Sequence, residues 1–496
     1  MIVALAFLAI ADLVVGISND AVNFLNSAIG SKAISFKTIM IVASMGVAIG
    51  AIFSSGMMEV ARKGIFNPGE FMFNEIMIIF MAVMITDILL LDIFNSLGMP
   101  TSTTVSIVFE LLGAAVAMAL IKIAAGGGDF SEVVNYINTS KASQIIFGIL
   151  LSVVVAFSIG AIVQWISRLL LSYDFQKKAV WVGALFSGIA LTAITYFIFM
   201  KGLKGTSYAK QSFDIIGGGT MKDFLESQVL SIVLVSSVIW SLLSYVLIAF
   251  AKTNIYKLII IVGTFALALA FAGNDLVNFI GVPVAAFNAY TEWSASGLSA
   301  GSFPMDVLAS KVPTNNWLLF GAGMVMVITL WFSTKAKDVV KTSLDLSNQG
   351  YTKERFQPNF LSRGFVRFAM GASKVTLFIL PISWQDKIEQ QFEQPVIKLA
   401  SNKVHELPAF DLVRAAVNLM VAAVLISIAT SYKLPLSTTY VTFMVAMGTS
   451  LADRAWGAES AVYRVAGVLN VIGGWFLTAL SAFSAAALVA YLLNLN

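Results

Sequence analysis

Long uncharged apolar runs fill this sequence and restrict what it can fold into. One of them, "VLSIVLVSSVIWSLLSYVLIAF" at 229–250, contains no charged residue. A helix needs about 20 mostly apolar residues to cross a bilayer. The whole chain is 58% hydrophobic and only 12% charged, whereas soluble domains carry about 25% charged residues. We therefore expect an all-α polytopic membrane protein, surrounded by a lipid bilayer.

The apolar runs predict about twelve transmembrane helices, with centres near residues 10, 47, 85, 112, 157, 190, 238, 265, 323, 420, 445 and 478. The first run, 2–16, has no basic flank and no small-residue cleavage site, which favours a membrane helix over a cleaved signal. The apolar segment 276–290 looks too short to cross and is expected to be a half-helix or a re-entrant piece.

Lys and Arg are more numerous in the loops that follow odd-numbered helices, mainly through the loop 333–408. This bias predicts that both termini face outward from a plasma or inner membrane. The sequence has no cysteine, and its one histidine, His405, lies in a polar stretch. These counts exclude disulfides and thiolate metal sites, and they remove the commonest general base from the membrane. The net charge of +4 requires no nucleic-acid partner, and neither an enzyme nor a bound cofactor is expected.

Two polar motifs occur twice in this apolar chain. "SNDAVNF" at 18–24 and "GNDLVNF" at 273–279 share N-D-x-V-N-F, while "PTSTT" at 100–104 returns as "PLSTT" at 435–439. An odd number of predicted crossings separates the copies, so the second copy is expected upside down. Polar interruptions at matching places of two inverted-topology repeats are typical of secondary transporters, whose broken helices or half-helices form a midplane site.

This repeat predicts the organisation of the chain. The first inverted repeat covers 1–172, and connecting transmembrane helices cover 173–253. The second repeat covers 254–332 and 409–496, interrupted by a cytoplasmic hydrophilic loop at 333–408. Within that loop, the run 364–384 is apolar with scattered cations and is expected to be an interfacial amphipathic helix.

The hydroxyl clusters have the residues that begin helices. Pro suits the first helical turn and Ser or Thr suits the N-cap, so each cluster predicts a helix that starts inside the membrane. Free N–H groups at such ends, with the hydroxyls, suit a tetrahedral oxyanion. Neither cluster contains Lys or Arg, so a cation from elsewhere must balance the anion. The candidate anion-binding residues are Ser102, Thr103, Thr104, Ser437, Thr438 and Thr439.

The N-D motifs offer ligands for that cation. Asp20 and Asn23 are three residues apart, as are Asp275 and Asn278, which places each pair on one helix face. Carboxylate and amide oxygens suit Na⁺ or another hard cation, and intramembrane carboxylates are functional candidates. The motifs together predict symport of cation and oxyanion. For any single Asn, Ser or Thr, a hydrogen bond between helices is the alternative. Glu110, six residues after the first cluster, is a candidate proton carrier or a structural hydrogen-bonding residue.

On these motifs the chain resembles the inorganic phosphate transporter (PiT) family of sodium- or proton-coupled phosphate permeases. That family carries two inverted G-A-N-D-x-x-N-A-like motifs, each followed by P-x-S-T-T. They correspond here to "ISNDAVNF" with "PTSTT" and "AGNDLVNF" with "PLSTT". The resemblance implies a twelve-helix inverted-repeat fold with both termini outside and phosphate contacts from the two S-T-T clusters. It also implies binding of co-transported Na⁺, or use of H⁺, around Asp20, Asn23, Asp275 and Asn278.

The chain departs from the family pattern at a few positions. Phe24 and Phe279 stand where the family usually has Ala, Ser18 replaces a small Ala, and Tyr440 occupies a position that is often His. No histidine-mediated proton step is therefore available there. The coupling ion and its stoichiometry, the affinity, and the oligomeric state, including a homo-oligomer, stay open.

Other functions remain to be weighed against phosphate symport. Sulfate is a similar tetrahedral dianion, so a sulfate or other oxyanion symporter of the same fold is one alternative, and a channel is another. An intramembrane aspartyl protease would use two membrane carboxylates that share a proton. The patterns of such proteases place Gly directly before each Asp, whereas Asn19 and Asn274 stand there in this chain.

Overall fold

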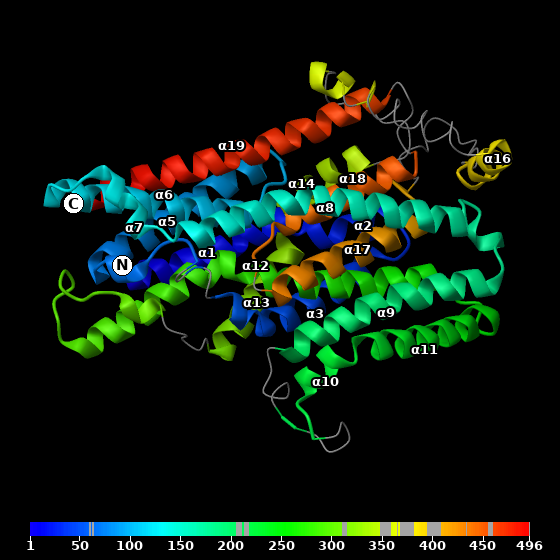
Figure 1. Cartoon of the computed structure of the whole chain (residues 1–496), viewed down its shortest axis with the longest axis horizontal. Helices are drawn as coiled ribbons and strands as arrows, with labels where there is room; N and C mark the ends of the chain where they lie inside the picture. The colour runs from blue at the N-terminus through cyan, green and yellow to red at the C-terminus, as the bar shows by residue number, and fades with distance from the viewer. Residues whose placement is uncertain are drawn as a thin grey trace.

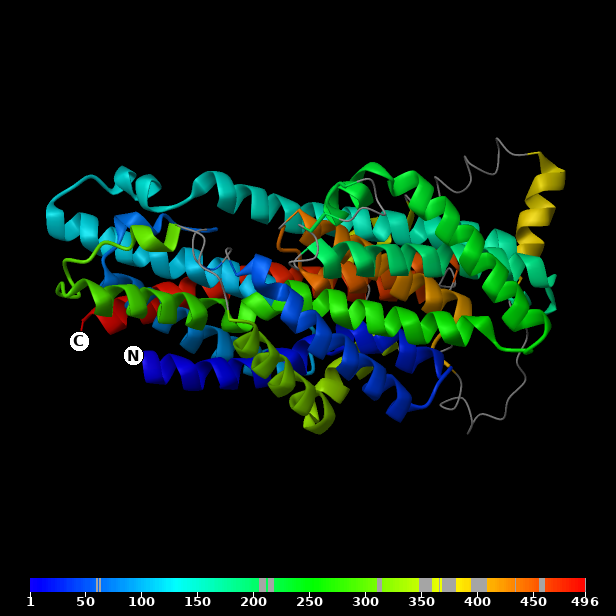
Figure 2. The ribbon, with the colours of Figure 1, turned by 90° about the horizontal axis from the view of Figure 1, so that it is seen from below.

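The computed structural model is an elongated bundle of long helices, and both termini lie at the same end of it (Figures 1 and 2). No β-strand occurs in the part of the chain that the structure describes, so the predicted all-α fold class is confirmed. The structure describes residues 1–58, 61, 64–204, 211–212, 218–309, 315–347, 359–364, 366–367, 381–393, 408–432, 434–454 and 460–495.

Nine helical stretches of the described residues are long and apolar enough to cross a membrane. They are α1 with α2 (Ile2–Asp20, Val22–Ser31), α5 (Phe73–Ser96), α6 (Thr103–Gly126), α8 (Thr139–Leu171), α9 (Val180–Lys204), α11 (Val229–Ala249), α12 (Ile255–Ser296), α17 (Leu412–Ser431) and α19 (Ser460–Asn494). A tenth span results if α13 (Asn316–Phe332) and α14 (Lys335–Ser347), bent by 72°, count as one.

Shorter helices complete the described chain. They are α3 (Phe36–Ile52), η1 (Phe53–Met57), η2 (Pro68–Glu70), η3 (Phe130–Glu132), α7 (Val133–Tyr136), η4 (Phe175–Lys177), α10 (Met221–Ser227), η7 (Asp306–Ala309), α16 (Ile382–Gln391) and α18 (Thr438–Ala452). Every predicted centre lies inside a helix. The number of full-length spans is nevertheless below twelve, because α3, α13 and α18 are only 17, 17 and 15 residues long.

The N-D motifs lie in helices that do not unwind. Ala21, between α1 and α2, keeps right-handed helical torsions (φ −55°, ψ −29°), and α12 runs without a break for 42 residues. The expectation that 276–290 is a separate half-helix was therefore wrong. Protein surrounds α12 on nearly all sides from residue 266 to residue 286, and such packing tolerates the missing N–H of Pro283 within a membrane helix. The breaks occur instead just before α6 and α18.

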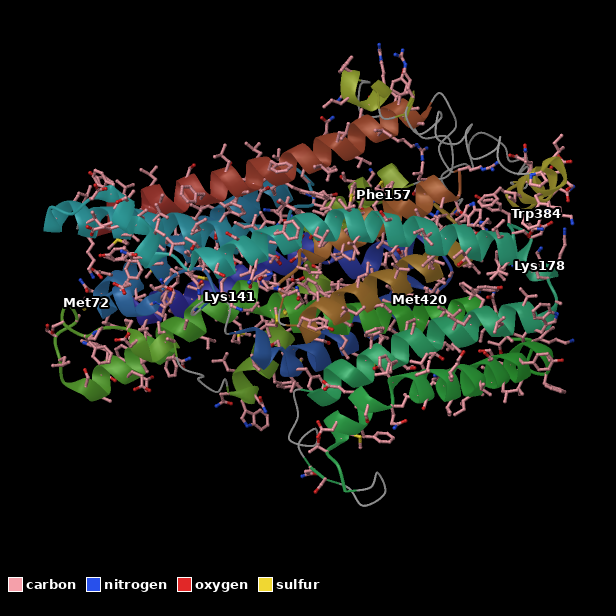
Figure 3. All side chains as sticks on the ribbon, in the orientation of Figure 1. Met72, Lys141, Phe157, Lys178, Trp384 and Met420 are labelled. Carbon is pink, nitrogen blue, oxygen red and sulfur yellow. The ribbon has the colours of Figure 1, made fainter. Side chains whose placement is uncertain are left out.

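Two long helices pack against partners from the other half of the chain. Helix α8 lies along α18, and α19 lies along α6. Small residues let the backbones approach at both crossings. A Cβ at Gly113 would lie 2.1 Å from the Phe483 carbonyl oxygen, and one at Gly448 would lie 2.2 Å from that of Phe157. Phe157 sits on the part of α8 that runs beside α18 (Figure 3).

A buried ion cluster ties α8 to the start of α17 and the end of α18. Arg168 is fully buried and forms salt bridges with Asp411 at 2.8 Å and Asp453 at 2.7 Å. The Tyr173 hydroxyl donates to the Asp453 carbonyl at 2.9 Å. Burial, followed by the charge of Asp453, raises the pKa of Tyr173, so the phenol stays a neutral donor. Three chain segments are thereby fixed at the end of the bundle opposite the termini (Figure 1).

Part of the predicted hydrophilic loop 333–408 is a helix that folds back onto the bundle. Helix α14 packs against α2 and buries Val339 and Val340, while Lys335 pairs with Asp92 of α5 at 2.6 Å. Farther along, Gln391 of α16 accepts a hydrogen bond from Lys178 at 2.9 Å, and Lys178 lies at the same end of the molecule as Trp384 of α16 (Figure 3). Most of the predicted interfacial helix 364–384 lies outside the described residues.

Substitutions at the two crossings are expected to show how tightly these helices pack. Gly113→Ala and Gly448→Ala each place a methyl group against a backbone carbonyl, and such overpacking costs about 1–3 kcal/mol. The control is Gly148→Ala in α8, where a Cβ meets no atom within 4 Å and helix propensity gains up to about 1 kcal/mol. Thermal unfolding of the purified protein in detergent would compare the three. Equal melting temperatures for all of them would contradict the close crossings.

Candidate functional site

The two hydroxyl clusters begin helices, as predicted. Ser102 is the N-cap of α6 and accepts a hydrogen bond from the Val105 N–H at 3.1 Å. Ser437 caps α18 in the same way, accepting from the Tyr440 N–H at 3.1 Å. A hydroxyl that accepts one bond still has a hydrogen to donate. Each cluster therefore presents a helix N-terminus, with its partial positive charge, in the middle of the bundle.

Asp20 lies between the two hydroxyl clusters. Its carboxylate accepts from Thr103 at 2.8 Å and from Thr439 at 3.1 Å, one residue from each cluster. The side chain is fully buried. The Asn23 amide donates to the carboxylate as well, at 3.3 Å. All three donors are neutral, so they solvate the carboxylate without cancelling its charge.

Asp275 has the matching position in the other half. It accepts from Thr104 of the first cluster at 3.3 Å, from Thr438 of the second, and from the Asn274 amide at 2.8 Å. The Thr104 hydroxyl also lies 3.1 Å from the Leu436 carbonyl oxygen. Asp275 is also fully buried. Each carboxylate is thus bound by one threonine from each cluster. The structure therefore brings the predicted Asp and Thr residues into a single centre.

The second Asn of each motif completes this centre. Asn23 donates to Thr438 at 3.1 Å and to Thr439 at 3.0 Å. Asn278 donates to the two threonines of the first cluster at 3.2 and 3.0 Å. Each amide thus binds the hydroxyl cluster that lies in the other half of the sequence. The amide nitrogens face the threonines, and an amide oxygen is the atom that would ligate a cation.

The first Asn of each motif also contributes, which was not predicted. Asn19 donates to the Met99 carbonyl at 3.1 Å and accepts from the Thr101 N–H at 2.9 Å. Asn274 donates to the Leu436 carbonyl at 3.0 Å. These bonds hold the two non-helical segments that lead into the clusters. The signal was present in the sequence, because both motif copies contain this Asn.

Aromatic rings at the departures from the family pattern wall the centre. Phe24 contacts Phe271 with ring centroids 5.1 Å apart, and Tyr440 stacks on Trp475 at 3.7 Å. The Phe279 ring fills the space where a side chain at position 16 would extend from Gly16. The rings of Phe24, Phe271 and Phe279 are fully buried, and those of Tyr440 and Trp475 are almost fully buried.

A polar cavity of about 10 Å³ adjoins the centre, which is space for about one water molecule. Asn23, Thr439 and Thr442 form its inner wall, and Asn26 and Asn418 extend it toward Ser343 of α14. The centre itself is closed in this conformation, because its Asp and Thr side chains are at most 2% exposed. Helix α14 contributes to the wall of this cavity through Ser343.

Comparisons with known proteins agree with this arrangement. The model of the phosphate transporter family matches residues 17–343, more than half of the chain. The chain belongs to the phosphate transporter family. The matched part contains both N-D motifs and the first hydroxyl cluster. The second cluster lies beyond it, but the structure places it beside the others. The protein is therefore a multi-pass membrane transporter and not an enzyme, which removes the aspartyl protease alternative.

Relatives of this transporter include two proteins that are named putative phosphate permeases. The one from Pyrococcus furiosus is 25% identical over 346 residues, covering 68% of this chain and 75% of its own. The one from Thermococcus kodakarensis is 25% identical, covering 68% and 76%. A solved structure titled as the sodium-dependent phosphate transporter matches with a TM-score of 0.66 and 17% identity, over 100% of this chain and 99% of the other. That likeness shows the fold.

The caps of α6 and α18 are expected to contribute to the stability of the transporter. Ser102→Ala or Ser437→Ala removes the acceptor for an N–H group and should cost about 1 kcal/mol, whereas Ser→Gly at the same positions should cost a few tenths. Denaturant unfolding in detergent would measure the difference within each pair. Equal stability of the Ala and Gly variants would show that neither serine acts as a cap.

Proposed function

We propose that this transporter imports inorganic phosphate by cation symport, with Na⁺ as the favoured cation. The observation that carries the proposal is the distribution of the four threonine hydroxyl hydrogens. Thr103 and Thr439 donate to Asp20, and Thr438 donates to Asp275. The Thr104 hydroxyl shares its hydrogen between Asp275 at 3.3 Å and the Leu436 carbonyl at 3.1 Å. In this arrangement the four hydroxyls donate to protein acceptors and are not directed at an anion.

Cation binding would release these hydroxyls for phosphate. A hydroxyl has one hydrogen, so a threonine that donates to a carboxylate cannot donate to an anion at the same time. A cation at the oxygens of Asp20 or Asp275 replaces the hydroxyl as their partner and neutralises their charge. The threonine hydrogens then turn toward the anion, and the repulsion between the carboxylates and phosphate falls. Cation and phosphate therefore bind together, with the cation first.

The roles of the residues follow from this coupling. Cation ligands come from Asp20, Asn23, Asp275 and Asn278. Phosphate contacts come from the hydroxyls of the two clusters and from the N–H groups that open α6 and α18. The phosphate-binding residues are Ser102, Thr103, Thr104, Ser437, Thr438 and Thr439.

Transport requires the closed centre to open toward each side of the membrane in turn. The two halves of the chain meet at the Asp and Thr side chains, and α1 and α12 run in opposite directions (Figure 1). Rocking of one inverted repeat against the other around this fixed centre is the expected movement. Both termini would face outward from a plasma or inner membrane, and the end that carries α14 and α16 would face the cytoplasm.

Uptake of radiolabelled phosphate into proteoliposomes tests the proposal directly. An inward Na⁺ gradient should drive uptake, and excess unlabelled sulfate should not compete. Asp20→Asn and Asp275→Asn should each lower uptake about 30-fold or more, because loss of one charge contact in a dehydrated site costs about 2–5 kcal/mol. Asp92→Asn, on the exposed pair with Lys335, is the matched control. Normal uptake in both site variants would refute the cation assignment, and competition by sulfate would reopen the substrate.

The order of binding is a separate prediction. Na⁺ alone should raise the melting temperature of the purified protein, since a ligand at 100 times its Kd stabilises by about 2.7 kcal/mol. Phosphate alone, in choline buffer, should leave it unchanged, and Na⁺ with phosphate should raise it further. The Na⁺ effect should be smaller in Asp20→Asn than in the wild type. Stabilisation by phosphate in the absence of Na⁺ would contradict a cation-first order.

A further inference from the structure

A second group of acidic side chains lies in the bundle apart from the central Asp and Thr residues. Asp12 of α1, Asp87 of α5 and Glu110 of α6 come from three neighbouring helices, and all three are fully buried. Asp12 precedes Asp20 by eight residues on α1, and Glu110 follows Thr103 by seven on α6. At a rise of about 1.5 Å per residue these are separations of about 12 and 10 Å. The group therefore forms a layer of its own, two helical turns from the centre.

The three carboxyl groups are neighbours, and most of their oxygens lack a donor. Asp12 lies beside Asp87, and Asp87 lies beside Glu110. Among the described residues, no hydrogen-bond donor reaches either oxygen of Asp12 or of Asp87, or the Oε2 atom of Glu110. A buried ionised carboxylate without a donor is costly, whereas a protonated carboxyl group is neutral and has a hydrogen to donate to a neighbouring carboxyl oxygen. The arrangement therefore favours at least one bound proton.

Nothing else in the surroundings balances this charge. Among the described residues, no Lys or Arg forms a salt bridge with any of the three. The other charged group that acts on Asp12 is Asp20, which is also acidic. Ser106 donates to Glu110 at 2.7 Å, but a hydroxyl is neutral. A proton neutralises a buried carboxylate without needing a further side chain, so protons fit this group.

The matching positions of the other half are apolar. The spacing between the two N-D motifs matches Asp12 with Leu267. The spacing between the two hydroxyl clusters matches Asp87 with Ala422 and Glu110 with Val445. Leu267, Ala422 and Val445 are all buried. The same helix packing is thus formed in the second half without any carboxyl group. Buried acidic residues are costly in a membrane protein and typically mark ion or proton pathways. The packing of these helices does not require carboxyl groups at these three positions. A chemical role therefore explains why they are present.

We propose that Asp12, Asp87 and Glu110 form a proton-binding site that takes up and releases a proton in each transport cycle. The inference rests on the proposed symport and adds a proton to it. The proton binds a carboxylate from the aqueous phase on one side and dissociates to the other side, with no other bond formed or broken. Helices α1 and α6 carry both this site and the central Asp20–Thr103 contact. A shift between the two helices when the centre loads therefore changes how the carboxyl groups share the proton.

Proteoliposomes that contain a pH-sensitive dye test the coupling. Phosphate uptake and acidification of the lumen are measured together under a Na⁺ gradient, and their ratio is compared between proteins. Asp87→Asn and Glu110→Gln should lower the number of protons per phosphate by about one relative to the wild type, while Asp92→Asn, on the same helix as Asp87, keeps the wild-type ratio. Phosphate itself carries the same number of protons in every protein, so this contribution cancels when the variant ratio is subtracted from the wild-type ratio. An unchanged ratio in both variants would overturn the proposal.

Infrared difference spectroscopy tests the site even where a variant does not transport. Adding Na⁺ and phosphate to the wild-type protein should change a carboxylic-acid C=O band that shifts in D₂O. That band should be missing from Asp87→Asn and should persist in Asp92→Asn. Absence of any such band change in the wild type would overturn the proposal. If the wild type takes up no phosphate at all, the symport proposal fails, while a deuterium-sensitive acid band lost in Asp87→Asn would still show the bound proton.

Discussion

The hydrogen bonds from four threonine hydroxyls to Asp20 and Asp275 determine how the helices of this transporter meet. A buried carboxylate costs several kcal/mol unless polar groups replace its water. Here the donors come from α6 and α18, so both helices must begin next to α1 and α12. Their chains must therefore leave helical form before Thr103 and Thr438. The short length of α18 and the turns held by Asn19 and Asn274 are consequences of this requirement.

Much of the centre could be predicted from the sequence because its parts are duplicated. Two copies of N-D-x-V-N-F and two S-T-T clusters indicated the residues, and Pro with Ser indicated where α6 and α18 begin. The continuity of α12 could not be predicted, because a protein environment rather than the local sequence makes Pro283 tolerable. The packing of α14 was equally hidden, since its polar face resembles that of a solvent-exposed loop.

The acidic layer shows a different limit of sequence reasoning. Asp12, Asp87 and Glu110 occur once each, at separations that correspond to no shared helix face, so no pattern linked them. Glu110 alone was singled out, through its distance from the first cluster. Convergence of the three depends on the way α1, α5 and α6 pack together. A second singular feature, the Arg168–Asp411–Asp453 cluster, joins the first half to the second. The two halves thus share a common centre but differ in the ionisable groups around it.

The exchange of α8 and α19 between the halves has a consequence for biogenesis. Helix α6 packs against α19, and α18 packs against α8, which is made long before it. During synthesis α8 must therefore wait for its partner while the chain between them is inserted. Neither half is able to complete its own packing alone. The first half reaches its final packing only after α18 and α19 have entered the membrane.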